Sequence, residues 1–243
     1  MTENQYKMNV TVIGAGKYGS AIGYTVQENP DRKLCFWLRN KETCEEINND
    51  RKNSKIGAPD LRWNDNVRAT NDHADASKDC DVMFLCIPAQ RIPDFIKDIE
   101  PHLEKKTILV NCAKGMILAK EKFICQVVAE EYPHLKERYC SLVGPSFASE
   151  VFKKWPTQVA IAGYVKENVM KVMDAVWSKF FKTYWQDDVI GCEMSGALKN
   201  VLALGAGYIE GLGYGYNTMA CWVTRGTKEM QMIGKHFGAN PIT

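Results

Sequence analysis

The chain has 243 residues, 45% of them hydrophobic and 25% charged, which is the ordinary composition of a globular protein with a packed core. Its 31 basic and 29 acidic residues leave a formal net charge of +2, so the charge balance favours neither nucleic acid nor a membrane surface as the main partner. Nine scattered cysteines without a Cys-x-x-Cys pair are typical of reduced thiols. We therefore expect a cytoplasmic protein without a disulfide framework.

The first residues predict no targeting signal, and the longest uncharged run near the end predicts no membrane span. The first residues, MTENQYKMN, contain neither an apolar segment nor an Arg- and Ser-rich one, so we expect no signal or transit peptide. The uncharged run at residues 200–209 is too short to span a bilayer. The four histidines are scattered without ligand spacing, and we expect no metal site.

Strand-like and helix-like patterns alternate along most of the chain. The predicted strands lie at residues 9–13, 33–38, 66–70, 81–87, 107–110, 139–143, 157–162 and 182–185. The predicted helices between them lie at 21–28, 90–99, 117–131 and 166–180, and a polar, helix-compatible segment lies at 42–55. This order predicts βαβ units and a doubly wound, mostly parallel sheet of the Rossmann type.

The alternation stops near residue 188, and two long helices are predicted at 190–209 and 217–237. We therefore predict a dinucleotide-binding domain at residues 1–188 and the start of an all-helical, substrate-binding domain at 189–243. Two helices are few for an independent core, so we expect them to pack on the first domain or on another copy of the chain, as in a homodimer.

A glycine-rich turn, Gly14-Ala15-Gly16-Lys17-Tyr18-Gly19, joins the first predicted strand to the first predicted helix. In the G-x-G-x-x-G pattern, Gly14 permits the tight turn, Gly16 lets a pyrophosphate approach the backbone, and Gly19 allows close packing of helix on strand. The helix N-terminus then presents free N–H groups to the phosphates. The alternative is a glycine turn that binds nothing, but its position at the first strand–helix junction favours dinucleotide binding.

The second predicted strand ends Trp37-Leu38-Arg39-Asn40, without the acidic residue that usually binds the ribose hydroxyls. Arg39 is suited to stack on adenine or to bind a ribose 2′-phosphate. The choice between NAD and NADP therefore stays open at this point, as does a reading of Arg39 as a solvated charge.

Three further segments place polar groups where a ligand can bind. Lys114 and the segment with Gly144 and Ser146 each follow a predicted strand, and the carboxyl ends of strands are where α/β sheets hold ligands. Lys199 lies between apolar helical turns, where partial burial would lower the pKa of its ammonium group and suit it to acid–base catalysis. The alternatives are a surface lysine at 114, an ordinary Gly-Pro turn at 144, and a helix-surface lysine at 199.

These segments together resemble those of the soluble NAD(P)-dependent glycerol-3-phosphate dehydrogenases. The matching stretches are GAGKYGSA, CIPAQ, NCAKG, VGPSFASEV, DVIGCEMSGALKN and GLGYGYNTMACWVTRGTKEM, in that order along nearly the whole chain. The combination of GPSFA, ALKN and the NT…TRG…EM run is much more specific than the glycine turn alone.

The resemblance implies an enzyme that interconverts sn-glycerol 3-phosphate and dihydroxyacetone phosphate by hydride transfer to or from NAD or NADP. It implies Lys199 as the proton donor and acceptor at the substrate oxygen, with Lys114 adding positive potential. The residues implied at the cofactor are Gly14, Gly16, Lys17, Tyr18, Gly19, Arg39, Pro88, Lys114 and Ala148, with Ala89 lining the same crevice. Those implied at the substrate are Lys114, Gly144, Ser146, Lys199 and Asn200.

In the family that this chain resembles, members continue past the point that corresponds to Thr243. A G-x-G-D segment there supplies an aspartate near the catalytic lysine, and an Arg-Asn pair after it binds the substrate phosphate and the cofactor. We therefore expect the C-terminal part of the helical domain to be missing from this chain. Two alternatives to the dehydrogenase remain: a non-catalytic dinucleotide-binding or regulatory protein, and a dehydrogenase of another small hydroxyacid.

Overall fold

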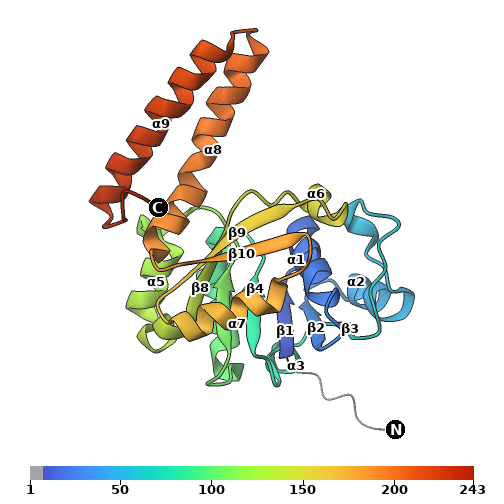
Figure 1. Ribbon diagram of the computed structural model, residues 1–243. Coiled ribbons are helices and arrows are strands. Elements are labelled where there is room, and N and C mark those ends of the chain that lie inside the picture. The colour runs from blue at the N-terminus through green and yellow to red at the C-terminus, as the bar shows by residue number, and fades with distance from the viewer. Residues whose placement is uncertain (1–7) are drawn as a thin grey trace.

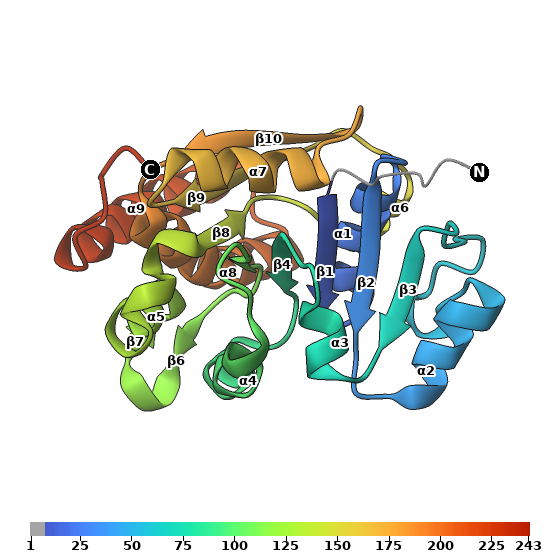
Figure 2. The same ribbon diagram turned by 90° about the horizontal axis from the view of Figure 1, so that it is seen from below.

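The computed structural model describes residues 8–243, so the expectation about the first residues lies partly outside the described range. Its centre is a sheet that, within residues 8–243, has eight strands in the order β10-β9-β8-β5-β4-β1-β2-β3 (Figures 1 and 2). All neighbouring strands are parallel except β8 and β9, which are antiparallel. The prediction of a doubly wound, mostly parallel sheet is confirmed.

The strands follow the predicted pattern within a residue or two at each end. Their bounds are β1 Met8–Ile13, β2 Arg32–Trp37, β3 Val67–Thr70, β4 Val82–Leu85, β5 Ile108–Asn111, β8 Tyr139–Val143, β9 Thr157–Gly163 and β10 Phe181–Gln186. Alternate residues of one strand belong to different cores. In β4, Val82 and Phe84 pack into one apolar cluster, and Met83 and Leu85 pack into the other. A strand buried on both faces reads as a continuous apolar run, which is why β4 was visible in the sequence.

Helices cover both faces of the sheet. One core contains residues of α1 (Lys17–Gln27), α6 (Ala148–Phe152) and α7 (Lys166–Val176). The other contains residues of α3 (His73–Ser77), α4 (Ile92–Ile99), α5 (Ile124–Glu131) and the first turns of α8 (Val189–Gly211). The start of α8 is thus part of the core under the sheet.

Several helix predictions were wrong in extent. The helix expected at 21–28 begins at Lys17, and the one expected at 166–180 ends at Val176. The helix expected at 117–131 begins only at Ile124, after a small hairpin of β6 (Met116–Ile117) and β7 (Lys122–Phe123). Glu121 adopts a left-handed conformation with φ +51°, and the Gln126 side chain accepts a hydrogen bond from the Phe123 N–H, which starts the helix there. Short α3 and α6 were not predicted, because five residues are too few to show a helical period.

The polar, helix-compatible segment at 42–55 does not form a single helix either. Helix α2 (Lys41–Glu45), capped by Asn40, passes into a π-helical turn at Glu46–Asp50. That turn ends at Arg51, whose φ of +56° is left-handed. One further turn of 3₁₀ helix, Ser54–Ile56, follows. The segment therefore folds back toward the glycine turn instead of forming one long helix.

The last part of the chain is a hairpin of α8 and α9 (Tyr216–His236) that projects from one end of the sheet (Figure 1). Asp188 caps α8 by accepting a hydrogen bond from the Gly191 N–H at 2.9 Å. The two helices can pack closely because residues 205 and 226 are glycines. A Cβ at Gly205 would lie 2.0 Å from the Trp222 ring, and one at Gly226 would lie 2.1 Å from Leu202. Two glycines thus fix the contact that α8 makes with α9. Both long helices were predicted.

Candidate active site at the carboxyl edge of the sheet

The glycine turn lies where β1 ends and α1 begins, beside the end of β4. Gly14 has φ +93°, and a Cβ on it would lie 2.8 Å from the Cys86 carbonyl oxygen. A Cβ on Gly19 would lie 1.9 Å from the Gly14 carbonyl oxygen, so Gly19 is required for α1 to pack on the turn. A Cβ on Gly16 would have no described heavy atom within 4 Å outside its own chain neighbours. Gly16 therefore faces open space, as a residue approached by a ligand would.

This turn sits at the switch point of the sheet. The chain runs from β1 outward to β2 and β3, and then returns to β4 on the other side of β1. The crevice at such a point, outside the carboxyl ends of the strands, is where doubly wound sheets hold ligands. Gly16 has no side chain to cap α1, so the amides of the first turn remain available to an anion such as a pyrophosphate.

Asn53 supports the turn from outside the motif. Its buried side-chain amide donates hydrogen bonds to the Ala15 carbonyl at 2.8 Å and to the Ser20 hydroxyl at 3.3 Å. It reaches this position because α2 and the following turns fold back. Sequence reasoning missed Asn53, since a single polar residue in a polar loop gives no signal.

The expected adenosine end lies beside β2. Exposed Arg39 lines one pocket together with Gly14, Gly16, Asn40 and Lys55. It also lines a neighbouring pocket, whose other described walls include Trp37, His73, Ile87 and Pro88. None of the described residues lining the first pocket is acidic. The charged residues of the first pocket are therefore Arg39 and Lys55, whereas the neighbouring pocket also contains Asp94 and Asp98. Lys55 was not anticipated from the sequence.

Tyr18 and Ser146 join the cofactor side to the expected substrate side. The Tyr18 hydroxyl and the Ser146 hydroxyl are hydrogen-bonded at 2.9 Å. Burial raises the pKa of Tyr18 well above its usual value, so this phenol stays protonated. Gly144 stands just before this contact, and a Cβ there would lie 2.8 Å from the Gln158 carbonyl oxygen. Ala148 follows at the first position of α6 and is half-buried.

Lys114 and Lys199 approach each other although they are far apart in sequence. Lys114 is in the turn after β5, next to Gly115 with its φ of +133°, and Lys199 is half-buried on α8. Lys114 is solvent-accessible, yet its pKa is lowered, first by partial desolvation and then by the nearby Lys199 ammonium. Exposed Asn200 follows Lys199 on the helix. Two cations that repel each other at the carboxyl edge of the sheet are suited to bind an anion.

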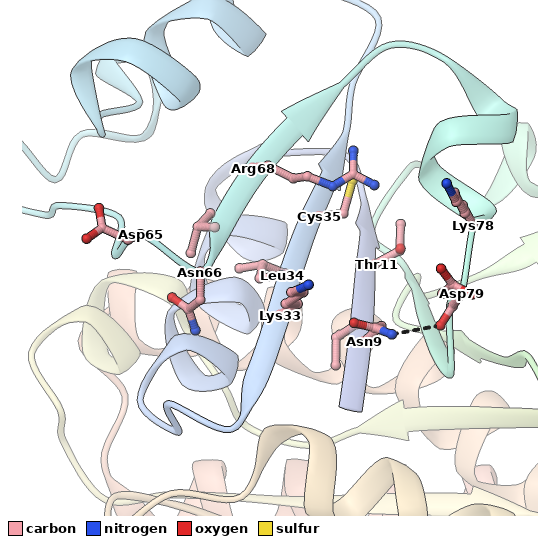
Figure 3. A pocket seen from close by; sticks show the side chains of 12 residues that line it. Asn9, Thr11, Lys33, Leu34, Cys35, Asp65, Asn66, Arg68, Lys78 and Asp79 are labelled. Atoms are coloured by element: carbon pink, nitrogen blue, oxygen red, sulfur yellow. Dashed lines mark hydrogen bonds between the residues drawn. The ribbon is translucent and has the colours of Figure 1, made fainter. Parts of the chain in front are cut away.

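A second hollow lies at the opposite edge of the sheet, around the amino ends of β1, β2 and β3 (Figure 3). Asn9, Lys33, Arg68 and Asp79 are among its lining residues, and the Asn9 side chain donates a hydrogen bond to the Asp79 carbonyl at 3.1 Å. It is remote from the glycine turn, because parallel strands present their carboxyl ends at the other edge. None of the residues predicted for the site lies there.

Other kinds of site find little support in the described part of the chain. Within residues 8–243, no group of three His, Cys, Asp or Glu side chains is arranged to hold a metal ion. Among the same residues, none of the helices combines the length and the apolar character that a membrane span requires.

Comparison with known proteins gives a consistent result. The model of the "NAD-dependent glycerol-3-phosphate dehydrogenase N-terminus" matches residues 9–169, and that of the corresponding C-terminus matches residues 188–243. The glycerol-3-phosphate dehydrogenase [NAD(P)+] of Syntrophomonas wolfei is 35% identical over 96% of this chain and 68% of its own length. That of Enterococcus faecalis is 36% identical over 98% of this chain and 69% of its own.

Solved structures agree. The glycerol-3-phosphate dehydrogenase of Coxiella burnetii superimposes with a TM-score of 0.84 at 25% identity, over 97% of this chain and 71% of that one. The enzyme of Saccharomyces cerevisiae gives a TM-score of 0.84 at 27% identity, over 96% of this chain and 72% of that one. With family models matched on both sides of residue 188 and relatives above 30% identity along almost its whole length, the chain belongs to the NAD-dependent glycerol-3-phosphate dehydrogenase family.

Proposed function

We propose that this chain interconverts sn-glycerol 3-phosphate and dihydroxyacetone phosphate, with NAD or NADP as the hydride carrier. The observation that carries the proposal is the place of Lys114 and Lys199 at the carboxyl edge of the sheet that holds the glycine turn. Lys114 lies in the turn after β5 and Lys199 lies on α8, and the Asn111–Glu193 hydrogen bond joins these two elements. The named activity of the relatives supports the same reaction. We also propose the division at residue 188 into a cofactor-binding part and a helical, substrate-binding part.

Gly14, Gly16 and Gly19 fit a dinucleotide, because the turn is tight, one glycine faces open space and the amides of the first turn of α1 are uncapped. In this proposal Lys17 and Tyr18 adjoin the pyrophosphate. Arg39 lies by the adenosine, Pro88 lines the crevice, and Ala148 lies near the bound cofactor. The nicotinamide supplies the hydride chemistry when it is bound.

The lysines have different tasks in the proposal. In the reducing direction, negative charge grows on the oxygen at carbon 2 of the substrate as the hydride arrives. The Lys199 Nζ gives its proton to that oxygen, and in the oxidising direction it takes the proton back. Lys114 keeps positive potential beside the same oxygen. Ser146, Gly144 and Asn200 complete the proposed substrate contacts. The anionic substrate also relieves the repulsion between the two ammonium groups.

The direct test is oxidation of NADH and NADPH by the full chain with dihydroxyacetone phosphate, compared with a panel of small oxoacids. The proposal expects turnover with dihydroxyacetone phosphate alone. Tight NADH binding without turnover of any substrate would support a non-catalytic binding protein, and turnover of an oxoacid alone would support a hydroxyacid dehydrogenase. Either result would overturn the proposal.

The proposal also covers the cellular compartment and the oligomeric state of the enzyme. All nine cysteines are free and only Cys221 is exposed, which supports the reducing environment of the cytoplasm. The α8–α9 hairpin exposes large apolar side chains such as Leu204 and Tyr208, at 77% and 69% of their areas, which supports a homodimer. Light scattering across a concentration series measures the assembly, and a constant monomer mass would contradict the dimer.

A further inference from the structure

Glu193 is a buried carboxylate in the first turns of α8, and it is only 5% exposed. It lies in the short run Gly191-Cys192-Glu193-Met194, in which every other residue is buried and uncharged. Burying a carboxylate is costly unless hydrogen bonds replace its water. Its partners therefore show what it does.

Four donors from three other elements surround this carboxylate. One oxygen accepts hydrogen bonds from the Asn111 side-chain amide at 2.9 Å and from the hydroxyls of Tyr139 and Ser141. The other accepts from the Cys125 backbone N–H in the first turn of α5, at 2.9 Å. All four donors are uncharged. Burial and the neighbouring carboxylate raise the pKa of Tyr139, which keeps that phenol protonated as a donor.

The contact to Asn111 extends to the turn that carries Lys114. Asn111 is the last residue of β5 and is 2% exposed. Its side-chain oxygen accepts a hydrogen bond from the Ala113 N–H at 2.8 Å. Glu193 can accept only from the NH₂ side of this amide, so it also fixes which way the amide oxygen points. The oxygen then holds Ala113, the residue directly before Lys114.

The same carboxylate belongs to the helix that carries Lys199. Residues 193 and 199 are separated by about 9 Å along the axis of α8 at the usual rise per residue. A helix transmits a fixed position over that length because its backbone is internally hydrogen-bonded. Glu193 is thus connected to both lysines. Helix α8 connects it to Lys199, and the hydrogen bonds through Asn111 and Ala113 connect it to Lys114.

From these contacts we infer that Glu193 is a positioning residue, which sets the geometry between Lys114 and Lys199 by holding α8 and the turn after β5 in one hydrogen-bonded unit. The inference deepens the proposed function and, for its kinetic test, rests on it. Glu193 itself touches neither substrate nor cofactor in this account.

Glu193→Gln tests this role with little change in size. An amide has a single acceptor oxygen, so its NH₂ must face either Asn111 or the Cys125 N–H, and both of those are donors. The hydroxyls of Tyr139 and Ser141 can turn to accept from the new NH₂, whereas the backbone N–H of Cys125 cannot turn. Asn111 is therefore the partner that must rotate, and Ala113 then loses its acceptor.

Two variants complete the design. Asn111→Ala removes the same link from the other side and leaves three donors on Glu193. Tyr139→Phe is the matched control, because it removes a donor from the same Glu193 oxygen in the same core but leaves Asn111 and Ala113 untouched.

With dihydroxyacetone phosphate and NADH, we expect Glu193→Gln and Asn111→Ala each to lower kcat about 10- to 100-fold, as small displacements of reacting groups do. The double variant should lose no more than either single variant, because both act through one link. The NADH dissociation constant should not change. Tyr139→Phe should lower the thermal midpoint but keep the wild-type kcat. All assays are run well below the lowest midpoint, so that unfolding does not contribute.

A second readout does not depend on turnover. Amide hydrogen exchange, followed by NMR on isotope-labelled protein, should accelerate at Ala113 in Glu193→Gln and Asn111→Ala, and not in Tyr139→Phe. Unchanged exchange at Ala113, or a kcat loss in Tyr139→Phe equal to that in Glu193→Gln, would overturn the inference in favour of a purely structural role. A wild-type chain without turnover would instead overturn the proposed function, while the exchange result would still decide the role of Glu193.

Discussion

The two halves of the candidate site are built in different ways. The central part of the cofactor half is a continuous segment, residues 14–19, in which Gly19 packs on Gly14 and both lie against Cys86 at the end of β4. The lysine half is assembled from β5, β8 and α8, and buried side chains such as Glu193 hold it together. A local turn is specified by its own residues, whereas a composite site depends on every element that carries part of it. Substitutions should therefore have separable effects on binding and on chemistry.

The largest difference between the effect on turnover and the effect on cofactor binding is expected for a substitution at Lys199. Lys199→Met removes the proposed proton donor and should lower kcat about 10²- to 10⁴-fold, the usual contribution of general acid–base catalysis. NADH binding should be unaffected, because the glycine turn is a separate structure. Steady-state kinetics and a fluorescence titration of NADH measure the two effects. A variant with wild-type turnover would remove Lys199 from the mechanism.

Replacing Lys114 should have opposite effects on activity and on stability: activity should fall and stability should rise. Lys114→Met should lower kcat/KM about 10- to 100-fold, since one positive group is lost from beside the reacting oxygen.

The thermal midpoint of Lys114→Met at neutral pH should rise slightly. The folded pKa of Lys114 is lowered by desolvation and by Lys199, so the folded state carries a penalty wherever this lysine is charged. That penalty is fully present below the folded pKa and disappears as the pH rises toward the unfolded value. The gain in midpoint should therefore shrink at alkaline pH, and a gain that grew with pH would contradict the assignment.

Two glycine substitutions in the cofactor half should differ in their effects, one mainly on stability and the other mainly on cofactor binding. Gly19→Ala should destabilise the fold by about 1–3 kcal/mol, because its Cβ would lie 1.9 Å from the Gly14 carbonyl. Gly16→Ala should leave the thermal midpoint nearly unchanged, because the space around it is open, but should weaken NADH binding about tenfold by obstructing the pyrophosphate. Calorimetry and NADH titration of both variants test this. Equal midpoint losses would show that Gly16 has a packing role instead.

The smallest predicted effect concerns cofactor choice. Arg39 and Lys55 line one pocket with Gly14 and Gly16. Arg39→Ala should weaken NADPH binding more than NADH binding, by about a factor of 10 between the two, because a guanidinium–phosphate contact is lost only with NADPH. The two dissociation constants, measured on the same samples, give the ratio. Equal losses for the two cofactors would assign Arg39 to the adenine ring and not to the 2′-phosphate.

The difference between the halves also explains what the sequence could predict. Strands such as β4 and helices such as α8 were visible, because long buried elements have a clear apolar pattern. The helix expected at 117–131 was wrong in its first part, because the left-handed turn at Glu121 and the cap at Gln126 decide where α5 begins. The glycine turn was recognisable because its spacing is local.

Asn53 and Asn111 were not recognisable, since each acts on a segment distant in sequence or through a partner on another element. Glu193 did leave a signal. A single acid within a small, apolar helical run is an expensive residue to bury, and it marks a position where hydrogen-bond donors must converge. The identity of those donors depends on the packing of α8 against β5, β8 and α5, which a linear pattern does not encode.

The most direct test of the central claim follows the hydrogen itself. The full chain is incubated with dihydroxyacetone phosphate and NADH deuterated at both transferable positions of the nicotinamide ring, and the product is analysed by mass spectrometry and NMR. We expect the wild-type chain to form glycerol 3-phosphate with one deuterium at carbon 2, and Lys199→Met to form almost no product. Intact dihydroxyacetone phosphate after prolonged incubation with cofactor-saturated wild-type protein, or product without deuterium at carbon 2, would contradict it.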